Sequence, residues 1–220
     1  MNEAALHAPM WATIARLGGA DISTPFDPKE DDGAPRPHTD EEGAHNGHEY
    51  VDLGLSVMWA ACNIGAERPE DYGDYFAWGE TETKEIFNND NCETWGEQMG
   101  DIDGTDRDVA HVKWGGKWRM PTLDEFKELL EKCTWAWTNR SYYAGYKVTG
   151  KNGNSIFLPA AGWCDETSLN STGSYGSYWS SMPDESNTQD ACDLYFGSGG
   201  RYTGWCGRYY GQPVRPVARL

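Results

Sequence analysis

The last 60 residues of this 220-residue chain limit its fold more than any other feature. They show no helical periodicity, and short aromatic stretches alternate with glycine and serine up to the segment 213–217. Short strands alone bury too little surface to be stable, so the earlier part of the chain must support them. Hydrophobic residues make up only 38% of the chain, but 11 Trp, 12 Tyr and 6 Phe cover large areas with few side chains. We therefore expect one core built mainly from aromatic residues.

A change in composition near residue 47 divides the chain in two. Residues 1–47 carry nine acidic and three basic side chains and five prolines, with almost no apolar pattern after Ile22. We interpret them as a flexible or oligomerising N-terminal arm, in which residues 4–17 form either one short helix or a frayed end. Glu3, Pro9 and Arg16 interrupt the first 20 residues, so we expect no cleavable secretion signal there. Residues 48–220 have the length of one ordinary domain.

Short strands with frequent turns are predicted from residue 49. The segment 50–55 alternates apolar and polar residues, and Val57–Ala60 follows closely enough to be its hairpin partner or continuation. A proline followed by acidic residues predicts a short helix over Pro69–Tyr75.

The clearest helix covers Leu123–Lys132. Thr122 and Glu125 have the spacing of a capping box, and apolar side chains recur on one face of the helix. A hairpin is predicted next, between 146–149 and 156–158, with Asn152 and Gly153 as a type I′ turn.

The net charge of −17 excludes some partners. A phosphate backbone would be repelled unless a strongly basic patch were segregated on one face, so we expect no nucleic acid partner. No apolar run approaches the ~20 residues of a membrane span, so we expect no membrane insertion. The only concentration of basic side chains lies near the C-terminus and consists of Arg201, Arg208, Arg215 and Arg219.

The six cysteines contain no Cys-x-x-Cys pair, which argues against a zinc knuckle or a thioredoxin-type site. Whether any of the cysteines form disulfides is not decided by the sequence, because a chain of this length does not need them for stability. His111 is the only histidine in the predicted folded part from residue 49, which removes metal centres with several histidines and favours a structural role for it. The cysteines are Cys62, Cys92, Cys133, Cys164, Cys192 and Cys206.

Four aspartates around a glycine form an acidic loop that is able to wrap a hard cation, and calcium is the candidate ion. The spacing is not that of an EF-hand, so a solvated acidic turn is the alternative interpretation. The aspartates are Asp101, Asp103, Asp106 and Asp108. No other cofactor is expected.

The C-terminal stretch mixes tyrosines with glycine, serine, asparagine and aspartate, as antibody combining loops do. Strand alternation over residues 193–197 predicts that Leu194 and Phe196 point inward. Trp179, Phe196 and Trp205 also fit a buried core. The predicted ligand-binding residues are Tyr178, Asp184, Asp193, Tyr195, Gly197, Tyr202, Cys206, Tyr209 and Tyr210.

Nine short motifs from residue 50 to residue 217 resemble, in order, the fibrobacter-type major paralogous domain of gut bacterial surface proteins. They are YVDLGL (50–55), WA (59–60), CNIGA (62–66), DYGDYFAWGE (71–80), WGG (114–116), WRMPT (118–122), LPAAG (158–162), YWSS (178–181) and VRPV (214–217). That family is similar to the formylglycine-generating-enzyme branch of the C-type lectin fold. The resemblance implies an α+β, C-type-lectin-like domain with short antiparallel strands, one or two helices and much irregular structure.

The same scaffold carries the variable proteins of diversity-generating retroelements. In those proteins, codons near the C-terminus are rewritten and the altered side chains lie together on a ligand-binding face. By this resemblance, residues 175–211 form a variable region, and within 184–211 anchor residues alternate with chemically arbitrary ones. The expected anchors are Leu194, Phe196, Arg208 and Gly211.

This chain departs from its relatives in two respects. The Glu-Pro-Asn, Gln-Pro-Asp and Trp-Asn-Asp motifs of calcium-dependent sugar binding are absent, so carbohydrate binding is not implied. The paired cysteines that bind copper in the enzyme branch have no close-spaced counterpart, since Cys192 and Cys206 lie far apart in sequence.

The sequence thus predicts a non-enzymatic binding protein that recognises a protein or glycoconjugate ligand through a diversified C-terminal surface. We expect exposure on a cell surface or a phage particle, with the N-terminal arm as a site of homo-oligomerisation. The alternatives are a metal- or thiol-dependent enzyme of the formylglycine-generating-enzyme branch and a structural surface or fimbrial subunit.

Overall fold

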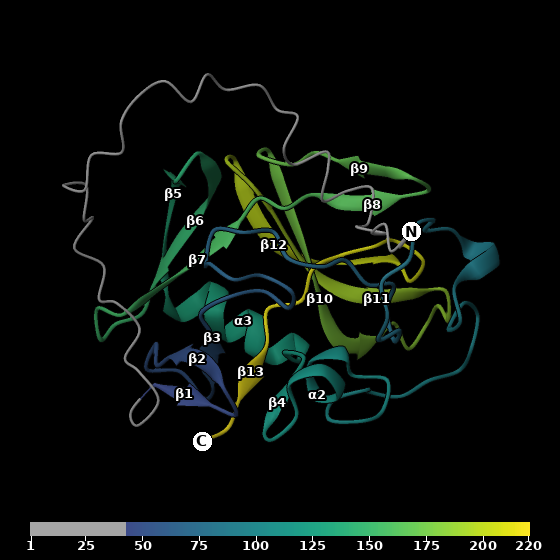
Figure 1. Cartoon of the computed structure of the whole chain (residues 1–220), viewed down its shortest axis with the longest axis horizontal. Coiled ribbons are helices and arrows are strands. Elements are labelled where there is room, and N and C mark those ends of the chain that lie inside the picture. The colour runs from purple at the N-terminus through teal and green to yellow at the C-terminus, as the bar shows by residue number, and fades with distance from the viewer. Residues whose placement is uncertain (1–42) are drawn as a thin grey trace, which may run out of the picture. The chain divides into compact units, whose positions relative to one another are not determined.

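Antiparallel strand pairs and two short α-helices build the part of the chain that the structure describes, residues 43–220 of a computed structural model (Figure 1). This agrees with the predicted α+β class. The structure places the start of the fold slightly earlier than residue 48, because Tyr50 N donates to Gly43 O at 2.8 Å. The rest of the predicted N-terminal arm lies outside the described residues. None of the helices in 43–220 is long and apolar enough to cross a membrane.

The first and last strands of the described region lie in one five-stranded sheet (Figure 1). The C-terminal strand β13 pairs with β3 on one side and with β4 on the other, so both ends of the domain are fixed in the same layer. In sheet order the strands are β1 (Ala44–His45), β2 (His48–Val51), β3 (Met58–Ala60), β13 (Val217–Ala218) and β4 (Trp118–Arg119).

Three smaller sheets follow along the chain. Two are meanders of three strands, and the third is a short hairpin. The first meander has β5 (Thr134–Arg140), β6 (Tyr143–Thr149) and β7 (Ser155–Pro159), and the second has β10 (Tyr175–Pro183), β11 (Asp190–Gly197) and β12 (Gly200–Gly207). The hairpin is β8 (Trp163–Asp165) and β9 (Ser168–Asn170).

The helix α3 (Leu123–Lys132) begins as the sequence predicts. Thr122 Oγ1 accepts from Glu125 N, and a Glu125 carboxylate oxygen accepts from Thr122 N, which completes the capping box. This helix contributes Phe126 and Leu129 to a buried core, which also contains side chains of β6, β7, β10 and β11. The shorter helix α2 (Val109–Trp114) lies beside β4, and a 3₁₀ turn covers Asn89–Asn91.

Two local predictions are partly or wholly wrong. The hairpin of β6 and β7 is present, but Thr149 pairs with Ser155, so the loop has five residues and is not a two-residue type I′ turn. The segment 69–75 is not helical. Gly73 there has φ +74° and approaches the Ile64 carbonyl so closely that a Cβ would lie 2.3 Å from the oxygen. That close approach needs a left-handed glycine, which ends any helical path.

The guanidinium of Arg215 links distant parts of the fold. The side chain is fully buried, and it donates to Ala60 O (3.1 Å), Ala61 O (2.6 Å) and Phe157 O (2.9 Å) and to Asn63 Oδ1 (2.7 Å). These acceptors lie on β3, on the loop after β3 and on β7. One side chain therefore fastens the C-terminal segment to two sheets.

We predict that Arg215→Met lowers the free energy of unfolding by about 3 kcal/mol or more, because several buried acceptors lose their donor at once. Urea denaturation followed by tryptophan fluorescence measures the change. Arg219→Met is the matched control. The Arg219 side chain is 71% exposed and makes one 3.5 Å ion pair with Glu125, so we expect a change of about 1 kcal/mol or less. Equal effects of the two substitutions would contradict the structural role of Arg215.

Candidate functional site

Tyrosine rings cover the outer face of the β10–β11–β12 sheet. The register aligns Ser177, Tyr195 and Tyr202 across the three strands. The ring of Tyr195 lies 5.4 Å from that of Tyr202 and 5.5 Å from that of Tyr175, and the ring of Trp163 from β8 lies 6.4 Å away. Tyr175 is 42% and Tyr202 58% exposed. We call Trp163, Tyr175, Tyr195 and Tyr202 the aromatic face.

A second pair of tyrosine rings follows the end of β12. The rings of Tyr209 and Tyr210 lie 4.2 Å apart, and Tyr209 also packs edge-on against Trp95 at 5.3 Å. Gly207 makes room for this pair, because a Cβ at that position would come within 2.9 Å of the Tyr209 ring. Both tyrosines are half-buried. They are therefore held in place by packing while part of each ring stays accessible.

On the opposite face of this sheet, side chains of β10 and β11 lie in the core. Leu194 and Phe196 are fully buried, as predicted, and they pack with residues of α3 and β6. Of the other expected anchors, Arg208 is buried and donates to Thr94 O (3.0 Å) and Glu97 O (2.9 Å). A Cβ on Gly211 would come within 2.6 Å of the Phe87 ring. All four expected anchors are thus structural.

Three of the predicted ligand-binding residues are covered by other side chains, so the prediction that they contact a ligand directly is wrong. Tyr178 is fully buried on the inner face, where its hydroxyl donates to Pro159 O at 2.7 Å. Asp193 and Gly197 do lie on the outer face, as strand alternation predicts. The Tyr175 ring covers Gly197, and Asp193 is enclosed by polar neighbours.

The Asp193 carboxylate is a buried polar group on the same face of the sheet as Tyr195 and Tyr202. Its Oδ2 accepts from Gln212 Nε2 at 3.2 Å and from Ser177 Oγ at 3.4 Å, and the structure records no ion pair for it. A Cβ on Gly204 would lie 3.2 Å from Oδ1, so the absence of a side chain there keeps the carboxylate uncrowded. Burial raises the pKa of Asp193 to about 6.

The remaining predicted residues lie at one end of the sheet. Cys206 is half-buried on the same face as Asp193, and it packs near Tyr210. Asp184 lies in the loop after β10, where its carboxylate accepts from Ser186 N (2.8 Å) and Ser186 Oγ (2.7 Å). Of the predicted set, Tyr195 and Tyr202 therefore lie together on the aromatic face, while Tyr209 and Tyr210 form a second ring pair that packs against Trp95.

Several accessible residues were missed by the sequence reasoning. Tyr175 and Trp163 belong to the aromatic face, and the alternation along β10 could have identified Tyr175. Trp205 fitted a buried core but is 53% exposed, on the other face of β12. Arg201 is also exposed there, with its guanidinium carbon 5.3 Å from the Trp135 ring centre. When both faces of an edge strand carry exposed side chains, the alternation of apolar and polar residues does not predict which of them is the binding face.

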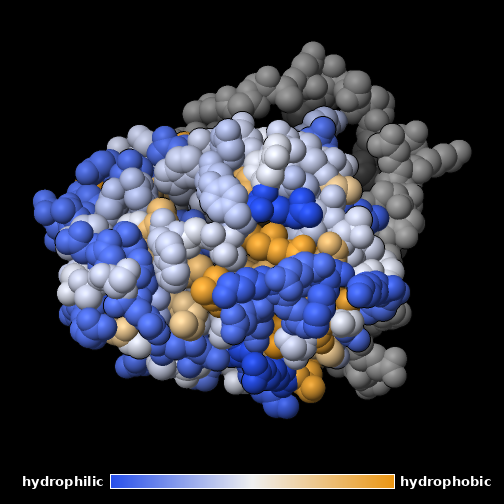
Figure 2. Space-filling view, turned by 180° about the vertical axis from the view of Figure 1, so that it is seen from behind, coloured by the Kyte–Doolittle hydropathy of each residue, from blue (hydrophilic) through white to orange (hydrophobic). Residues whose placement is uncertain are grey.

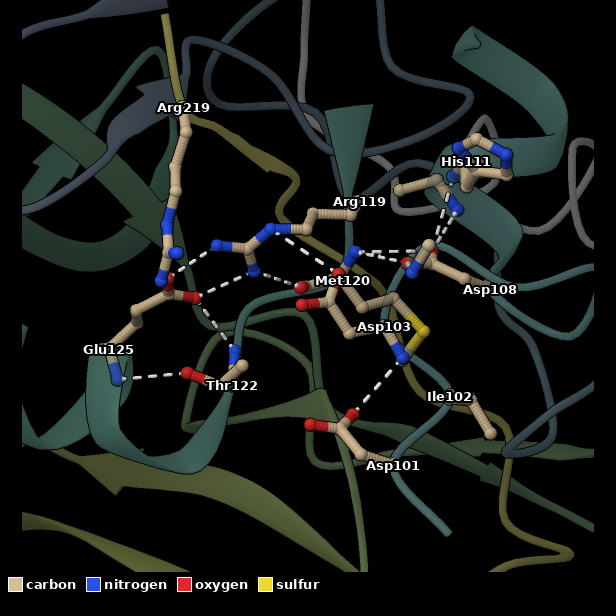
Figure 3. Close-up of polar contacts among 12 residues, drawn as sticks. Asp101, Ile102, Asp103, Asp108, His111, Arg119, Met120, Thr122, Glu125 and Arg219 are labelled. Atoms are coloured by element: carbon tan, nitrogen blue, oxygen red, sulfur yellow. Dashed lines mark hydrogen bonds and ion pairs between the residues drawn. The ribbon is translucent and has the colours of Figure 1, made fainter. Parts of the chain in front are cut away.

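The acidic loop does not form the predicted calcium site (Figure 3). The Asp108 carboxylate is fully buried and accepts from the backbone nitrogens of Gly104, Ala110, His111 and Met120, so it caps α2. Within 43–220, no three His, Cys, Asp or Glu side chains are grouped so that they could hold a metal ion.

Two further aspartates of this loop, Asp101 and Asp103, also make structural contacts (Figure 3). Asp103 lies 3.3 Å from Arg119 Nε, and Asp101 Oδ1 accepts from Asp103 N at 3.0 Å. Arg119 in turn forms a buried, two-pronged ion pair with Glu125 of α3. The alternative interpretation, an acidic turn, fits these contacts.

Two histidines beyond His111 belong to the fold, which corrects the prediction of a single one. His45 Nε2 accepts from Lys117 N at 2.8 Å, and the His48 ring stacks on Trp114 with centroids 3.8 Å apart. Burial lowers the pKa of His48. Both side chains fasten the first hairpin to the α2–β4 region, which is a structural role.

Cys192 and Cys206 cannot form one two-sulfur centre. The register pairs Cys192 with Trp205 and Cys206 with Ala191, so the two thiols lie on opposite faces of the sheet. Burial raises the pKa of each thiol to about 12, which leaves both protonated near neutral pH. All six cysteines are free thiols.

The aromatic face is not a pocket. Two hollows, of about 280 and 670 Å³, lie elsewhere among the described residues. The smaller is lined by residues of 79–107 that include four carboxylates, and the larger runs along α3 and is lined mainly by charged side chains. Hydrophilic side chains predominate on the face in Figure 2, where apolar ones gather in a central band. An open aromatic sheet suits a macromolecular surface better than a small molecule.

Comparison with known families gives one match. Residues 134–217 match a family described as a domain of unknown function, DUF8237. The match begins at β5 and ends at the first residue of β13, so it contains every strand of the aromatic face and none of the helices. No curated protein and no solved structure matches the chain.

The buried Asp193 predicts a pH-dependent stability. Its folded pKa is raised, so between about pH 4 and 6 the folded chain binds more protons than the unfolded chain, and burying the charge destabilises the fold increasingly as pH rises. We expect the free energy of unfolding of Asp193→Asn, relative to wild type, to rise by about 2–3 kcal/mol from pH 4 to pH 7. Urea denaturation at stepped pH measures this.

Asp184→Asn is the matched control. Hydrogen bonds from Ser186 lower the pKa of Asp184, so its stabilising contribution is present at neutral pH and is lost as pH falls. The pH trend of this variant relative to wild type should therefore have the opposite sign. A pH-independent difference for Asp193→Asn would contradict the assignment of a destabilising buried charge.

Proposed function

We propose that this chain is a non-enzymatic binding protein whose aromatic face, together with Tyr209 and Tyr210, contacts a protein or glycoconjugate ligand. The observation that carries the proposal is the row of adjacent Tyr175, Tyr195 and Tyr202 rings on one face of the sheet, where Tyr175 and Tyr202 are exposed. On the opposite face, Leu194 and Phe196 of the same sheet are buried in the core. Tyrosine offers a large contact area and a hydroxyl while losing little conformational entropy on binding.

The support beneath the array favours binding without large rearrangement. Leu194 and Phe196 alternate with Tyr195 along β11, so the exposed ring is fixed by two buried neighbours. Beyond the strand, Arg208 holds the turn that carries Tyr209 and Tyr210 through bonds to three carbonyls, and its guanidinium lies 4.5 Å over the Trp78 ring. A preorganised surface reduces the ordering cost of association.

The resemblance to C-type-lectin-like variable proteins adds to this proposal. In the second half of β11, the buried Leu194 and Phe196 alternate with the more accessible Tyr195, which is the arrangement that a diversified surface requires, whereas residues 177–181 are all buried. Exchange of Tyr195 or Tyr202 removes ring contacts within the array but no hydrogen bond that the structure records for either side chain. We propose that these positions, with Tyr209 and Tyr210, include the exchangeable ones.

An enzyme of the formylglycine-generating-enzyme branch is less well supported. The two thiols that such chemistry would pair lie on opposite faces of the sheet and are protonated near neutral pH. The competing hypothesis is a structural surface subunit that binds no ligand. That hypothesis does not explain the aromatic face. Of the four C-terminal arginines, Arg208 and Arg215 are buried, so no continuous basic surface for a nucleic acid arises from them.

The proposal predicts that loss of two rings removes binding without unfolding the chain. Wild type is first screened on a glycan array and a protein microarray, and each hit is measured again with a Tyr195→Ser/Tyr202→Ser double variant. We expect at least about a 30-fold loss of affinity, since two aromatic anchors contribute about 2 kcal/mol or more.

Tyr142→Ser is the matched control, because Tyr142 is 97% exposed in the turn between β5 and β6, outside the aromatic face. It should bind as wild type does. Unchanged affinity in the double variant, or equal loss in the control, would place the ligand elsewhere on the chain.

A further inference from the structure

The two edge strands of the β10–β11–β12 sheet differ in whether their outer backbone groups are hydrogen-bonded. Along the outer edge of β10, Trp179 N donates to Pro213 O and Ser181 N to Pro121 O, while Tyr175 O accepts from Gly162 N. Neighbouring backbone thus closes that edge. Within residues 43–220, no strand or bridge pairs with the outer edge of β12, and its one backbone bond outside the β11 pairing runs from Tyr210 N to Gly207 O at the last residue of the strand.

The open edge has little of the usual protection against pairing. β12 is eight residues long, contains no proline and no lysine, and carries Arg201 as its single charged residue. Natural edge strands are commonly shortened, bulged or charged to prevent association with another strand. β12 is neither short nor bulged, since Arg201–Trp205 pairs with β11 without a register shift, and the charge of Arg201 is the one such device that it carries. The edge is therefore suited to accept a further strand.

The sequence of β12 is complementary to itself when it is reversed about Thr203. In an antiparallel pair centred there, Arg201 of one chain lies opposite Trp205 of the other, and Tyr202 lies opposite Gly204. The first pairing places a guanidinium against an indole, and the second places an aromatic ring over a glycine, two favourable cross-strand combinations. Both pairings occur twice about the two-fold axis.

We propose that β12 pairs edge to edge with β12 of a second copy of this chain, about a two-fold axis at Thr203. The exposed Trp205 and Tyr202 are then covered by a partner, and the two sheets become one sheet of six strands. The guanidinium of Arg201 lies near the Trp135 and Tyr146 rings of its own chain, and its side chain is exposed, so the Trp205 ring of the partner can approach it from the solvent side.

Charge favours this edge for contact between two copies. The chain has a net charge of −17, but residues 194–220 contain no acidic residue, and two of their four arginines, Arg201 and Arg219, are exposed. Two copies that meet at β12 approach through the stretch that lacks carboxylates, while their other surfaces repel each other. Added salt screens that repulsion and should strengthen the dimer.

The dimer would also join the aromatic faces. Tyr195 of each copy lies one strand away from the pairing edge, on the same side of the sheet as Tyr202. A ligand would meet two arrays side by side, so weak contacts would be reinforced by avidity. The pairing itself does not depend on the proposed ligand-binding function.

Sedimentation velocity of the full chain over a concentration series tests the pairing. We expect a monomer–dimer equilibrium whose dissociation constant increases at least about tenfold in Thr203→Lys, because two lysines then face each other at the axis. Thr138→Lys is the matched control, since Thr138 is an exposed threonine on the edge strand β5 and should leave the equilibrium unchanged. Thermal melting verifies that both variants are folded.

A cross-link provides a second readout that does not require a destabilising substitution. In the proposed pair, the two Thr203 Cα atoms lie about 4.5–5.5 Å apart, within disulfide range. Thr203→Cys should form a covalent dimer on mild oxidation at a rate well above wild type and Thr138→Cys. Monomeric wild type at every soluble concentration, an unaltered dimer in Thr203→Lys, or equal cross-linking of the two cysteine variants would each overturn the proposal.

Discussion

The buried guanidinium of Arg215 is the contact on which the rest of the structure depends. It brings donors to carbonyls of β7 and of the segment that follows β3, and it comes from the chain just before β13. Irregular backbone inside a protein must satisfy its carbonyl groups, and a planar group with five donors does so at several points at once. Arg208 repeats this solution for the loop 94–97, so two arginines substitute for the regular structure that the chain lacks.

These ties explain how a sheet with an open aromatic face can be stable. The inner side chains of β10 and β11 lie in a core that α3 and the first meander close, and Val217 of the C-terminal segment belongs to the same core. Stability therefore resides in residues that do not reach the surface. The outward tyrosines contribute ring contacts with one another, and the fold does not need their chemistry.

Patterns that depend on near neighbours were predictable from the sequence. The helix α3 and its capping box, the β2–β3 hairpin and the inward direction of Leu194 and Phe196 follow from local periodicity. Long-range packing was not predictable. The buried hydroxyl of Tyr178 donates to Pro159 O, which lies on another sheet. The buried carboxylate of Asp108 accepts from Met120 N as well as from the N-terminus of α2. Asp193 lies on the outer face but is covered by residues from other segments, among them Gln212. Alternation along one strand does not predict such a cover.

A stability measurement on a saturation library tests most directly whether the scaffold and the surface are separate. Every residue of β11, β12 and the turn after β12 is replaced by all others, and folding is scored by protease resistance of displayed chains. The account predicts that most substitutions are tolerated at Tyr195, Tyr202, Tyr209 and Tyr210, while few are tolerated at Leu194, Phe196 and Arg208. Equal sensitivity of the two groups would contradict it.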